Sequence, residues 1–227
     1  MARKSVSNIA FATPQFKYQR FHSLLHRSDL NDHTIVFDVE GALLKSSSMF
    51  SYFMAVAFEA GGLIRAMVLL LVYPFICLVD DETSLKIMVM ICFFGIKEES
   101  CRVGRAVLPK LLLEDVGLEM FEVLKKGSRK VGLSKLPRVM VESFLKEYLE
   151  IDFVVGRELK LFNGFYVGLM EERNCMHANL ELVHERKITC SHMIGISGSN
   201  NVLGHSLFSS CKVCLLLLSQ SMQFTPF

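Results

Sequence analysis

The chain has 227 residues, a formal net charge of +2 and 51% hydrophobic residues, and its length fits one ordinary domain with an insertion or a tail. A charge this close to neutral, without Lys/Arg clusters that alternate with aromatic residues, argues against a nucleic-acid partner. The apolar share exceeds the need of a small soluble domain and indicates a membrane or a partner surface.

Residues 1–32 form a basic leader. They carry five Lys or Arg side chains against two Asp and are rich in Ser and aromatic residues. This composition is that of a transit peptide, and equally that of a disordered basic segment. We therefore expect a flexible leader.

The apolar run Thr34–Phe37 predicts a buried strand, and carboxylates follow it directly at Asp38 and Glu40. The carboxyl end of a buried strand is where α/β sheets bind ligands. A carboxylate there can attack a phosphoryl group, while a second one handles the proton of the leaving group. Gly41 lets the chain turn sharply away. The alternative is an ordinary acidic turn after a strand.

Two apolar segments follow at 66–79 and 85–96, joined by the acidic pair Asp80-Asp81. Each is shorter than the roughly 20 residues that a bilayer-spanning helix needs. They can form a re-entrant hairpin, an interfacial anchor or the buried helices of a cap domain. Because neither segment has a polar face, we expect membrane attachment through the apolar hairpin 66–96.

Further strands are expected at 130–133, 152–155, 192–196 and 212–218, with a small β extension at 165–169 and a helix at 137–149. Strands that alternate with helices, with one long helical insertion after the first strand, predict an α/β fold with a Rossmann-like parallel sheet and a cap. The expected organisation is an α/β core at 33–48 and 129–218, a helical cap at 49–128 and a tail at 219–227.

The segments Phe37–Ser46 and Phe50–Gly62 resemble the start of the plant sn-2 glycerol-3-phosphate acyltransferase family. The segments 104–110 and 136–149 follow in the family's order. These proteins carry an N-terminal haloacid-dehalogenase-like (HAD-like) phosphatase domain. The resemblance therefore implies a HAD-like Rossmannoid sheet with a membrane-associating helical cap. The family's acyltransferase domain lies C-terminal to the matched region, and we expect it to be missing from this chain.

The resemblance also implies roles for single residues. Asp38 matches the nucleophile, but Glu40 stands where active members have Asp, which makes the proton donor one methylene too long. Ser134 matches the Ser or Thr that hydrogen-bonds the phosphoryl group, although it reads equally as a capping or turn serine. Asn200 and Gly204 replace the acids that hold Mg²⁺, so we expect a weak Mg²⁺ site at most, on Asp38 and Asn200. The expected lysine has no secure match, with Lys187 the candidate.

The family transfers an acyl group from acyl-CoA to glycerol 3-phosphate in cutin and suberin synthesis, which the resemblance implies for the full-length protein. We expect this chain alone to be inactive as a phosphatase and bound to the endoplasmic reticulum membrane, with mitochondria as the alternative because of the leader. Two other readings stay open: an active Mg²⁺-dependent lysophosphatidate phosphatase, and a non-enzymatic membrane or interaction module. The expected partners are membrane lipid, lysophosphatidate or glycerol phosphate, and a full-length acyltransferase relative.

Overall fold

The computed structural model describes residues 33–46, 48–101, 107–171, 193–198 and 213–216. The predicted leader at 1–32 and the predicted tail at 219–227 lie outside these ranges.

A five-stranded parallel sheet forms the core, in the order β3-β2-β1-β6-β7. The strands are β1 (Thr34–Asp38), β2 (Arg129–Pro137), β3 (Phe153–Arg157), β6 (Met193–Ser197) and β7 (Val213–Leu216). Every residue of the central strand β1 is buried, as its apolar run requires. The predicted α/β fold with a parallel sheet and a helical insertion after the first strand is confirmed.

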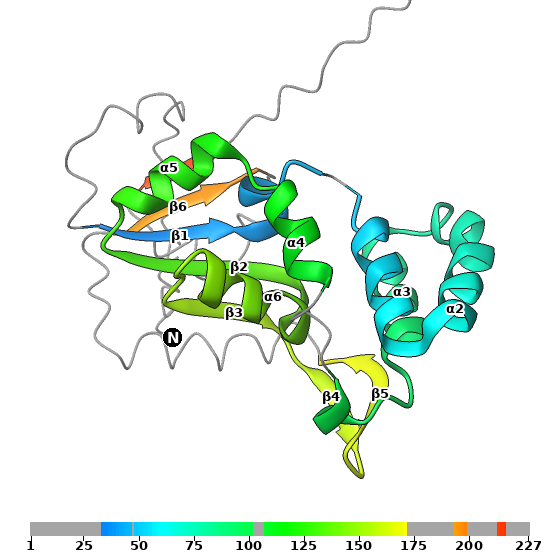
Figure 1. Cartoon of the computed structure of the whole chain (residues 1–227). Helices are drawn as coiled ribbons and strands as arrows, with labels where there is room; N and C mark the ends of the chain where they lie inside the picture. Colours follow the sequence, from blue (N-terminus) through cyan, green and yellow to red (C-terminus); the bar gives the residue numbers. More distant parts are fainter. Residues whose placement is uncertain (1–32, 47, 102–106, 172–192, 199–212, 217–227) are drawn as a thin grey trace, which may run out of the picture.

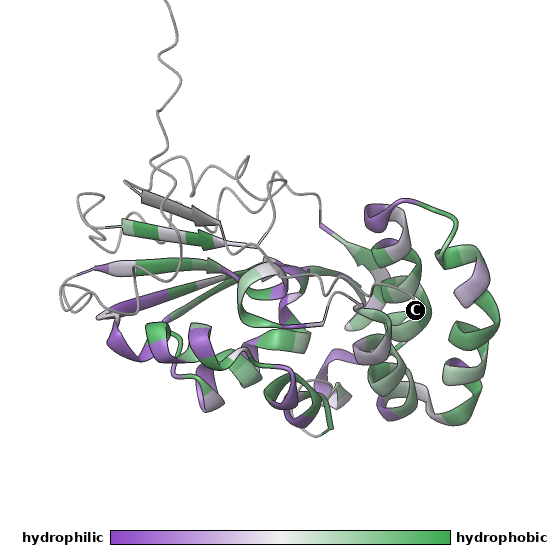
Figure 2. Cartoon of the chain, turned by 90° about the horizontal axis from the view of Figure 1, so that it is seen from above, coloured by the Kyte–Doolittle hydropathy of each residue, from purple (hydrophilic) through white to green (hydrophobic). Residues whose placement is uncertain are grey.

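Three helices cover one face of this sheet, as Figures 1 and 2 show. They are α4 (Val107–Glu114), α5 (Leu118–Lys126) and α6 (Arg138–Ser143), and α6 continues as a π-helical turn at Phe144–Tyr148. The strand that the sequence predicts at 130–133 runs on to Pro137, which caps α6 instead of lying inside it.

The helical insertion after β1 is a cap beyond the carboxyl ends of the strands (Figure 1). It contains α2 (Phe50–Ile76) and α3 (Asp81–Phe93). Within α2, Gly62 has φ 64° and ψ −156°, which is not helical. The rings of Phe50 and Tyr73 lie 4.0 Å apart, whereas a straight helix would separate these residues by about 35 Å. The chain of α2 therefore doubles back at Gly62.

Polar side chains bind the free backbone groups at both ends of α3, and one of them, Arg65, comes from the second half of α2. Asp80 accepts a hydrogen bond from the Thr83 amide (3.0 Å) and caps the start of α3. The Arg65 guanidinium donates to the carbonyls of Cys92 (2.8 Å) and Phe94 (2.7 Å), at the other end of α3. A cation at this end satisfies carbonyls that the helix leaves free. Both ends of α3 are thus capped by side chains.

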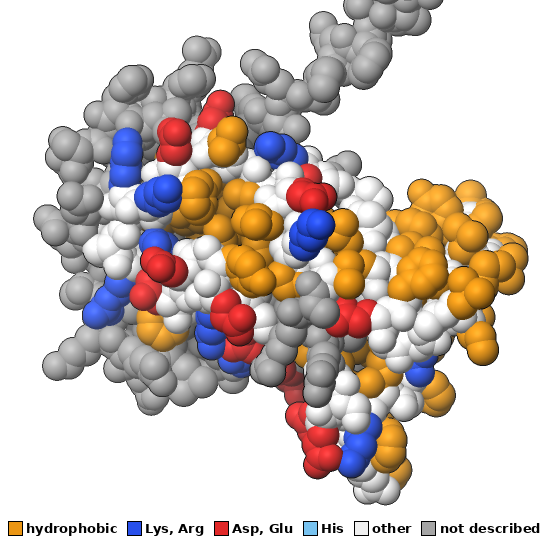
Figure 3. Space-filling model, in the orientation of Figure 1, with side chains coloured by type: hydrophobic (Ala, Val, Ile, Leu, Met, Phe, Trp, Pro, Cys, Tyr) orange, Lys and Arg blue, Asp and Glu red, His pale blue; other side chains and the backbone are white. Residues whose placement is uncertain are grey.

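Counted as one element of 27 residues, α2 is the one helix among the described residues that is long and apolar enough, by length and composition, to cross a membrane, but the reversal at Gly62 divides that length into two shorter helices. Its most apolar 18-residue window is only 22% buried. Hydrophobic side chains gather on the outer side of the cap, over α2 (Figure 3). The exposed large ones on its second half are Leu63, Ile64, Met67, Val68, Leu70, Leu71, Tyr73 and Phe75.

A small antiparallel hairpin joins the cap to the core. It consists of β4 (Leu159–Phe162) and β5 (Phe165–Met170) and follows β3 directly. Tyr166 exchanges two backbone hydrogen bonds of 2.8 Å with Gly95 and Ile96, just after α3. The hairpin therefore ties the core's third strand to the end of the cap.

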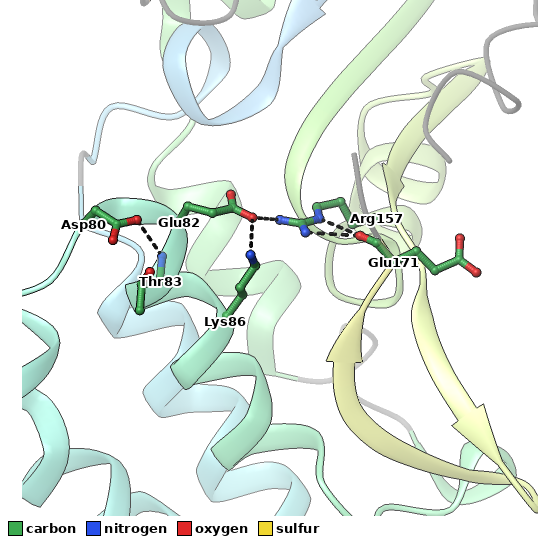
Figure 4. A network of polar contacts seen from close by, with 6 residues as sticks. All are labelled: Asp80, Glu82, Thr83, Lys86, Arg157 and Glu171. Atoms are coloured by element: carbon green, nitrogen blue, oxygen red, sulfur yellow. Dashed lines mark hydrogen bonds and ion pairs between the residues drawn. The ribbon is translucent and has the colours of Figure 1, made fainter. Parts of the chain in front are cut away.

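A partly buried ion pair makes a second link between cap and core (Figure 4). The guanidinium of Arg157, at the end of β3, donates to Glu82 of α3 at 2.7 Å and to the Glu171 carbonyl at 3.1 and 3.2 Å. The Arg157 side chain is 5% exposed and that of Glu82 is 28% exposed, so the arginine is protected from water while the glutamate is partly solvated.

The chain enters and leaves the cap at one place. Leu44 and Val116 form an antiparallel bridge, and the Gly117 amide donates to the Leu43 carbonyl at 2.8 Å. Asp115 also holds the segment by which the chain enters the cap. Its carboxylate accepts hydrogen bonds from the Ser46 amide (2.9 Å) and from the hydroxyl of Tyr52 at the start of α2.

Candidate functional site

Buried polar side chains mark the carboxyl edge of the sheet. Asp38 ends β1, Ser134 lies near the end of β2, and Ser197 ends β6; they are 2%, 1% and 0% exposed. Phe37 lies opposite Ile196 in the register of β1 and β6. The next residues of these two parallel strands, Asp38 and Ser197, therefore lie side by side. This is the edge at which parallel sheets bind ligands.

The Asp38 carboxyl is held in an unfavourable environment for its charge. Burial, together with the nearby charge of Glu40, raises its pKa to about 7, against the opposing effect of Lys135 and of the Gly41 amide. Its Oδ2 atom is buried and has no hydrogen-bond partner among the described residues. This environment therefore disfavours the ionised form of Asp38, which is the form that attacks a phosphoryl group.

Glu40 lies in the π-helical turn Val39–Leu43 and directs its carboxylate to β2. Oε1 accepts hydrogen bonds from the Ser134 hydroxyl and from the amides of Lys135 (3.1 Å) and Leu136 (3.3 Å), and Oε2 accepts from the Lys135 amide at 3.0 Å. The Leu136 amide also donates to Ser134 Oγ at 3.1 Å. The carboxylate is thus fixed by three neighbouring residues of one strand.

The sheet itself makes these donors available. The β2–β3 ladder is interrupted between Leu133 and Pro137, and β1 pairs with β2 no further than Leu133. The amides of Lys135 and Leu136 therefore need acceptors from outside the ladders, because buried amides are almost always paired. Glu40 supplies that acceptor.

Two glycines allow the turn after β1 to approach the end of β6. A side chain at Gly198 would collide with the carbonyl oxygen of Gly41, and one at Gly41 would collide with Asp38. The turn that carries Glu40 is therefore pressed against β6, which limits the room beside Asp38.

The structure brings together three of the predicted site residues, Asp38, Glu40 and Ser134, and puts Glu40 and Ser134 in hydrogen-bond contact. Asn200, Gly204 and Lys187 lie outside the described residues, so their roles stay predictions. Sequence reasoning missed Lys135, although its position next to Ser134 was a usable signal, because a basic residue there lies near the expected phosphate. It also missed Ser197.

The described part of the chain holds no cluster of three or more His, Cys, Asp or Glu side chains that suits a metal ion. Mg²⁺ prefers several oxygen ligands, usually including carboxylates. The unpaired Oδ2 of Asp38 is one such oxygen, but the carboxylate of Glu40 is bound to β2. The described residues alone therefore do not complete a Mg²⁺ site, and the weak site predicted on Asp38 and Asn200 remains a prediction.

A parallel sheet in this order, with a helical cap inserted directly after a strand that ends in a buried Asp, defines the class of HAD-like α/β domains. Residues 34–217 match the family model described as "Glycerol-3-phosphate acyltransferase RAM2-like, HAD-like domain". The chain belongs to this plant glycerol-3-phosphate acyltransferase family, and the resemblance seen in the sequence is confirmed.

Curated relatives agree with this assignment. The chain is 55% identical over 195 residues to "Probable glycerol-3-phosphate acyltransferase 3" of Arabidopsis thaliana, covering 85% of this chain and 38% of the relative. It is 52% identical over 201 residues to "Probable glycerol-3-phosphate acyltransferase 2" of the same plant (87% and 38%), and 33% identical to "Glycerol-3-phosphate acyltransferase RAM2" of Petunia hybrida (67% and 33%). The chain spans less than two fifths of the length of these relatives.

Solved structures are similar to this chain to different degrees. A Bordetella pertussis protein of unknown function matches with a TM-score of 0.53 at 9% identity, covering 73% of this chain and 82% of that chain. A phospho-aspartyl intermediate analogue of phosphoserine phosphatase matches with a TM-score of 0.48 at 17% identity, covering 82% and 86%. At 9% identity the likeness to the Bordetella pertussis protein concerns the fold alone.

Proposed function

We propose that this chain is a phosphatase-inactive, membrane-attached HAD-like domain of a glycerol-3-phosphate acyltransferase that serves glycerolipid synthesis for cutin or suberin. Family membership supports the assignment to the acyltransferases. Acyl transfer from acyl-CoA to glycerol 3-phosphate belongs to the full-length protein in this proposal, since the matched part covers 38% of the relatives.

The geometry of Glu40 carries the proposal of inactivity. A phosphatase of this type needs an ionised nucleophile and, two residues on, a carboxyl that delivers a proton to the leaving group. Here Asp38 has a pKa of about 7, and the carboxylate of Glu40 is bound to Ser134 and to the amides of β2. Neither side chain is therefore prepared for its step. In this proposal Mg²⁺ binds weakly or not at all.

Phosphate release tests this proposal against an active lysophosphatidate phosphatase. The detergent-solubilised full chain is assayed with lysophosphatidate, glycerol 3-phosphate and p-nitrophenyl phosphate in the presence of Mg²⁺. We expect the same background rate for the wild type and for Asp38→Asn. A Mg²⁺-dependent rate in the wild type that Asp38→Asn abolishes would establish the phosphatase instead.

Membrane attachment is supported by the exposed apolar side of α2. Arg65 and Asp80 flank fourteen residues without a charge, and the chain reverses at Gly62. The helical segment 63–76, which contains Pro74 in its last turn, is about 21 Å long, against a hydrocarbon core of about 30 Å. In our proposal it therefore lies along the surface of a membrane, that of the endoplasmic reticulum, without crossing it. Mitochondria remain the alternative location.

Vesicle flotation tests this arrangement. We expect the wild type to float with phosphatidylcholine vesicles and the double variant Leu71→Glu/Phe75→Glu to stay at the bottom of the gradient. Leu118→Glu is the matched control, because Leu118 is 72% exposed on α5, outside the cap. If the double variant floats as well as the wild type, the outer side of α2 is not the attachment surface, and contact with a full-length acyltransferase relative becomes the better explanation of its exposure.

A further inference from the structure

The donors around Glu40 form a compact anion-binding site. One hydroxyl, from Ser134, and two successive backbone amides, from Lys135 and Leu136, converge on one carboxylate. Successive amides that point the same way form a concave site for anions such as phosphate. The charge of Lys135 acts on the neighbouring Asp38 carboxyl, where it opposes the rise in pKa that burial and Glu40 cause. The hydroxyl and the two amides are therefore accompanied by one cationic side chain.

These donors are too well buried to be left without an acceptor. Ser134 is 1% exposed and Leu136 is fully buried. A buried donor that loses its partner destabilises a fold, because it has already given up its hydrogen bond to water. A hydrogen-bond acceptor at this place is therefore a requirement of the fold as well as a feature of a binding site.

Glu40 meets that requirement from within the chain. Its residue number differs from that of Ser134 by 94, so the contact exists only in the folded domain. A carboxylate and a phosphate group offer the same kind of oxygen acceptor to such donors. While the Glu40 oxygens occupy the donors, a phosphate oxygen cannot bind to them.

We propose that the Glu40 carboxylate is an internal ligand that occupies the phosphate site of this domain, so that the native chain does not bind phosphate or phosphomonoesters and gains this ability when the carboxylate is shortened or removed. This inference rests on the proposed inactivity and adds its structural cause. Competition for the same donors excludes the anion, independently of any chemical step.

The test is thermal unfolding of the full chain in detergent, titrated with inorganic phosphate and compared with chloride at the same ionic strength. The wild type should not respond to phosphate. Glu40→Ala should unfold at a lower temperature in chloride, and phosphate should raise its midpoint by about 3 °C or more, since a ligand that binds only the folded state stabilises it. Glu40→Asp, which is one methylene shorter, should respond in the same direction.

Two further variants separate this inference from its alternatives. Ser134→Ala in the Glu40→Ala background should abolish the phosphate response, while Glu99→Ala, an exposed acid on the cap side, should behave like the wild type. If Glu40→Ala does not fold in chloride, Glu40→Asp carries the test. Equal responses of the wild type and the Glu40 variants, or no response in any of them, would overturn the inference. Phosphate release by the wild type would refute the proposed function, whereas no hydrolysis together with unresponsive variants would refute the internal ligand alone.

Discussion

The replacement Asp38→Asn should make the domain more stable at neutral and alkaline pH. The buried carboxyl has a pKa of about 7 in the folded chain, against 3.8 as its ordinary value. Between these two pH values the unfolded chain has released a proton that the folded chain still holds, so stability falls as the pH rises through this window. Above pH 7 the loss is complete. Asn carries no charge and avoids it.

The size of this effect follows from the pKa difference. Each factor of ten in the proton affinity corresponds to about 1.4 kcal/mol, so the full difference is worth about 4 kcal/mol. Glu40 contributes part of it through its charge, and the two carboxyls titrate together, so we expect about 2–4 kcal/mol. The free energies of unfolding of the wild type and Asp38→Asn should be similar at pH 4 and differ by this amount at pH 8.

Urea unfolding followed by circular dichroism, at intervals between pH 4 and 8, measures the difference. Asp81→Asn is the control, because it removes the same charge at an exposed position of the cap. It should leave the pH dependence of the wild type in place. Parallel curves for the wild type and Asp38→Asn would refute the argument, since they would mean that Asp38 is ionised in the folded chain at neutral pH. The case for an unprepared nucleophile would then be lost.

Three other changes test features that shape the cap: two side-chain contacts and the backbone reversal within α2. Tyr52→Phe removes one hydrogen bond to Asp115 and should lower the free energy of unfolding by about 1–2 kcal/mol in urea titrations. Arg157→Met removes the buried partner of Glu82 and should cost about 1–3 kcal/mol, because Glu82 stays 28% exposed and keeps its contact with Lys86. In a double-mutant cycle its effect should be non-additive with that of Glu82→Gln. A Cβ atom added at Gly62 meets no atom of the described residues within 4 Å. The expected cost of Gly62→Ala, about 1–3 kcal/mol, therefore comes from the positive φ of the backbone and should appear as a lower thermal midpoint.

The sequence predicts the sheet well because its strands are short apolar runs between polar segments. Thr34–Phe37 becomes β1, and the position of Asp38 at its end follows directly. The pair Gly61-Gly62 predicts a break, since two glycines weaken a helix. The extension of β2 to Pro137 does not follow from the pattern, because the irregular part of this strand is fixed by its neighbours and not by its own periodicity.

The contacts of the site are less accessible to sequence reasoning. Asp38 and Ser134 can be placed at one edge of a parallel sheet without coordinates. The direction of the Glu40 side chain depends on a π-helical turn and on amides that a ladder interruption leaves free, and neither has a sequence signature. The pairing of Glu82 with Arg157 joins cap and core over 75 residues of sequence, so only the folded chain shows it.

The way in which the chain enters and leaves the cap keeps the strand order of the core independent of the length of the cap. Leu44 and Val116 are bridge partners, so the whole excursion between them starts and ends at the same point of the core. An insertion with adjacent ends can change in length without altering the order of the strands that precede and follow it. The position of the cap is nevertheless fixed from the core side, by the backbone contacts of Tyr166 and by the pair of Arg157 with Glu82. Changes on the outer side of the cap that keep these contacts should therefore leave the donors around Glu40 in place.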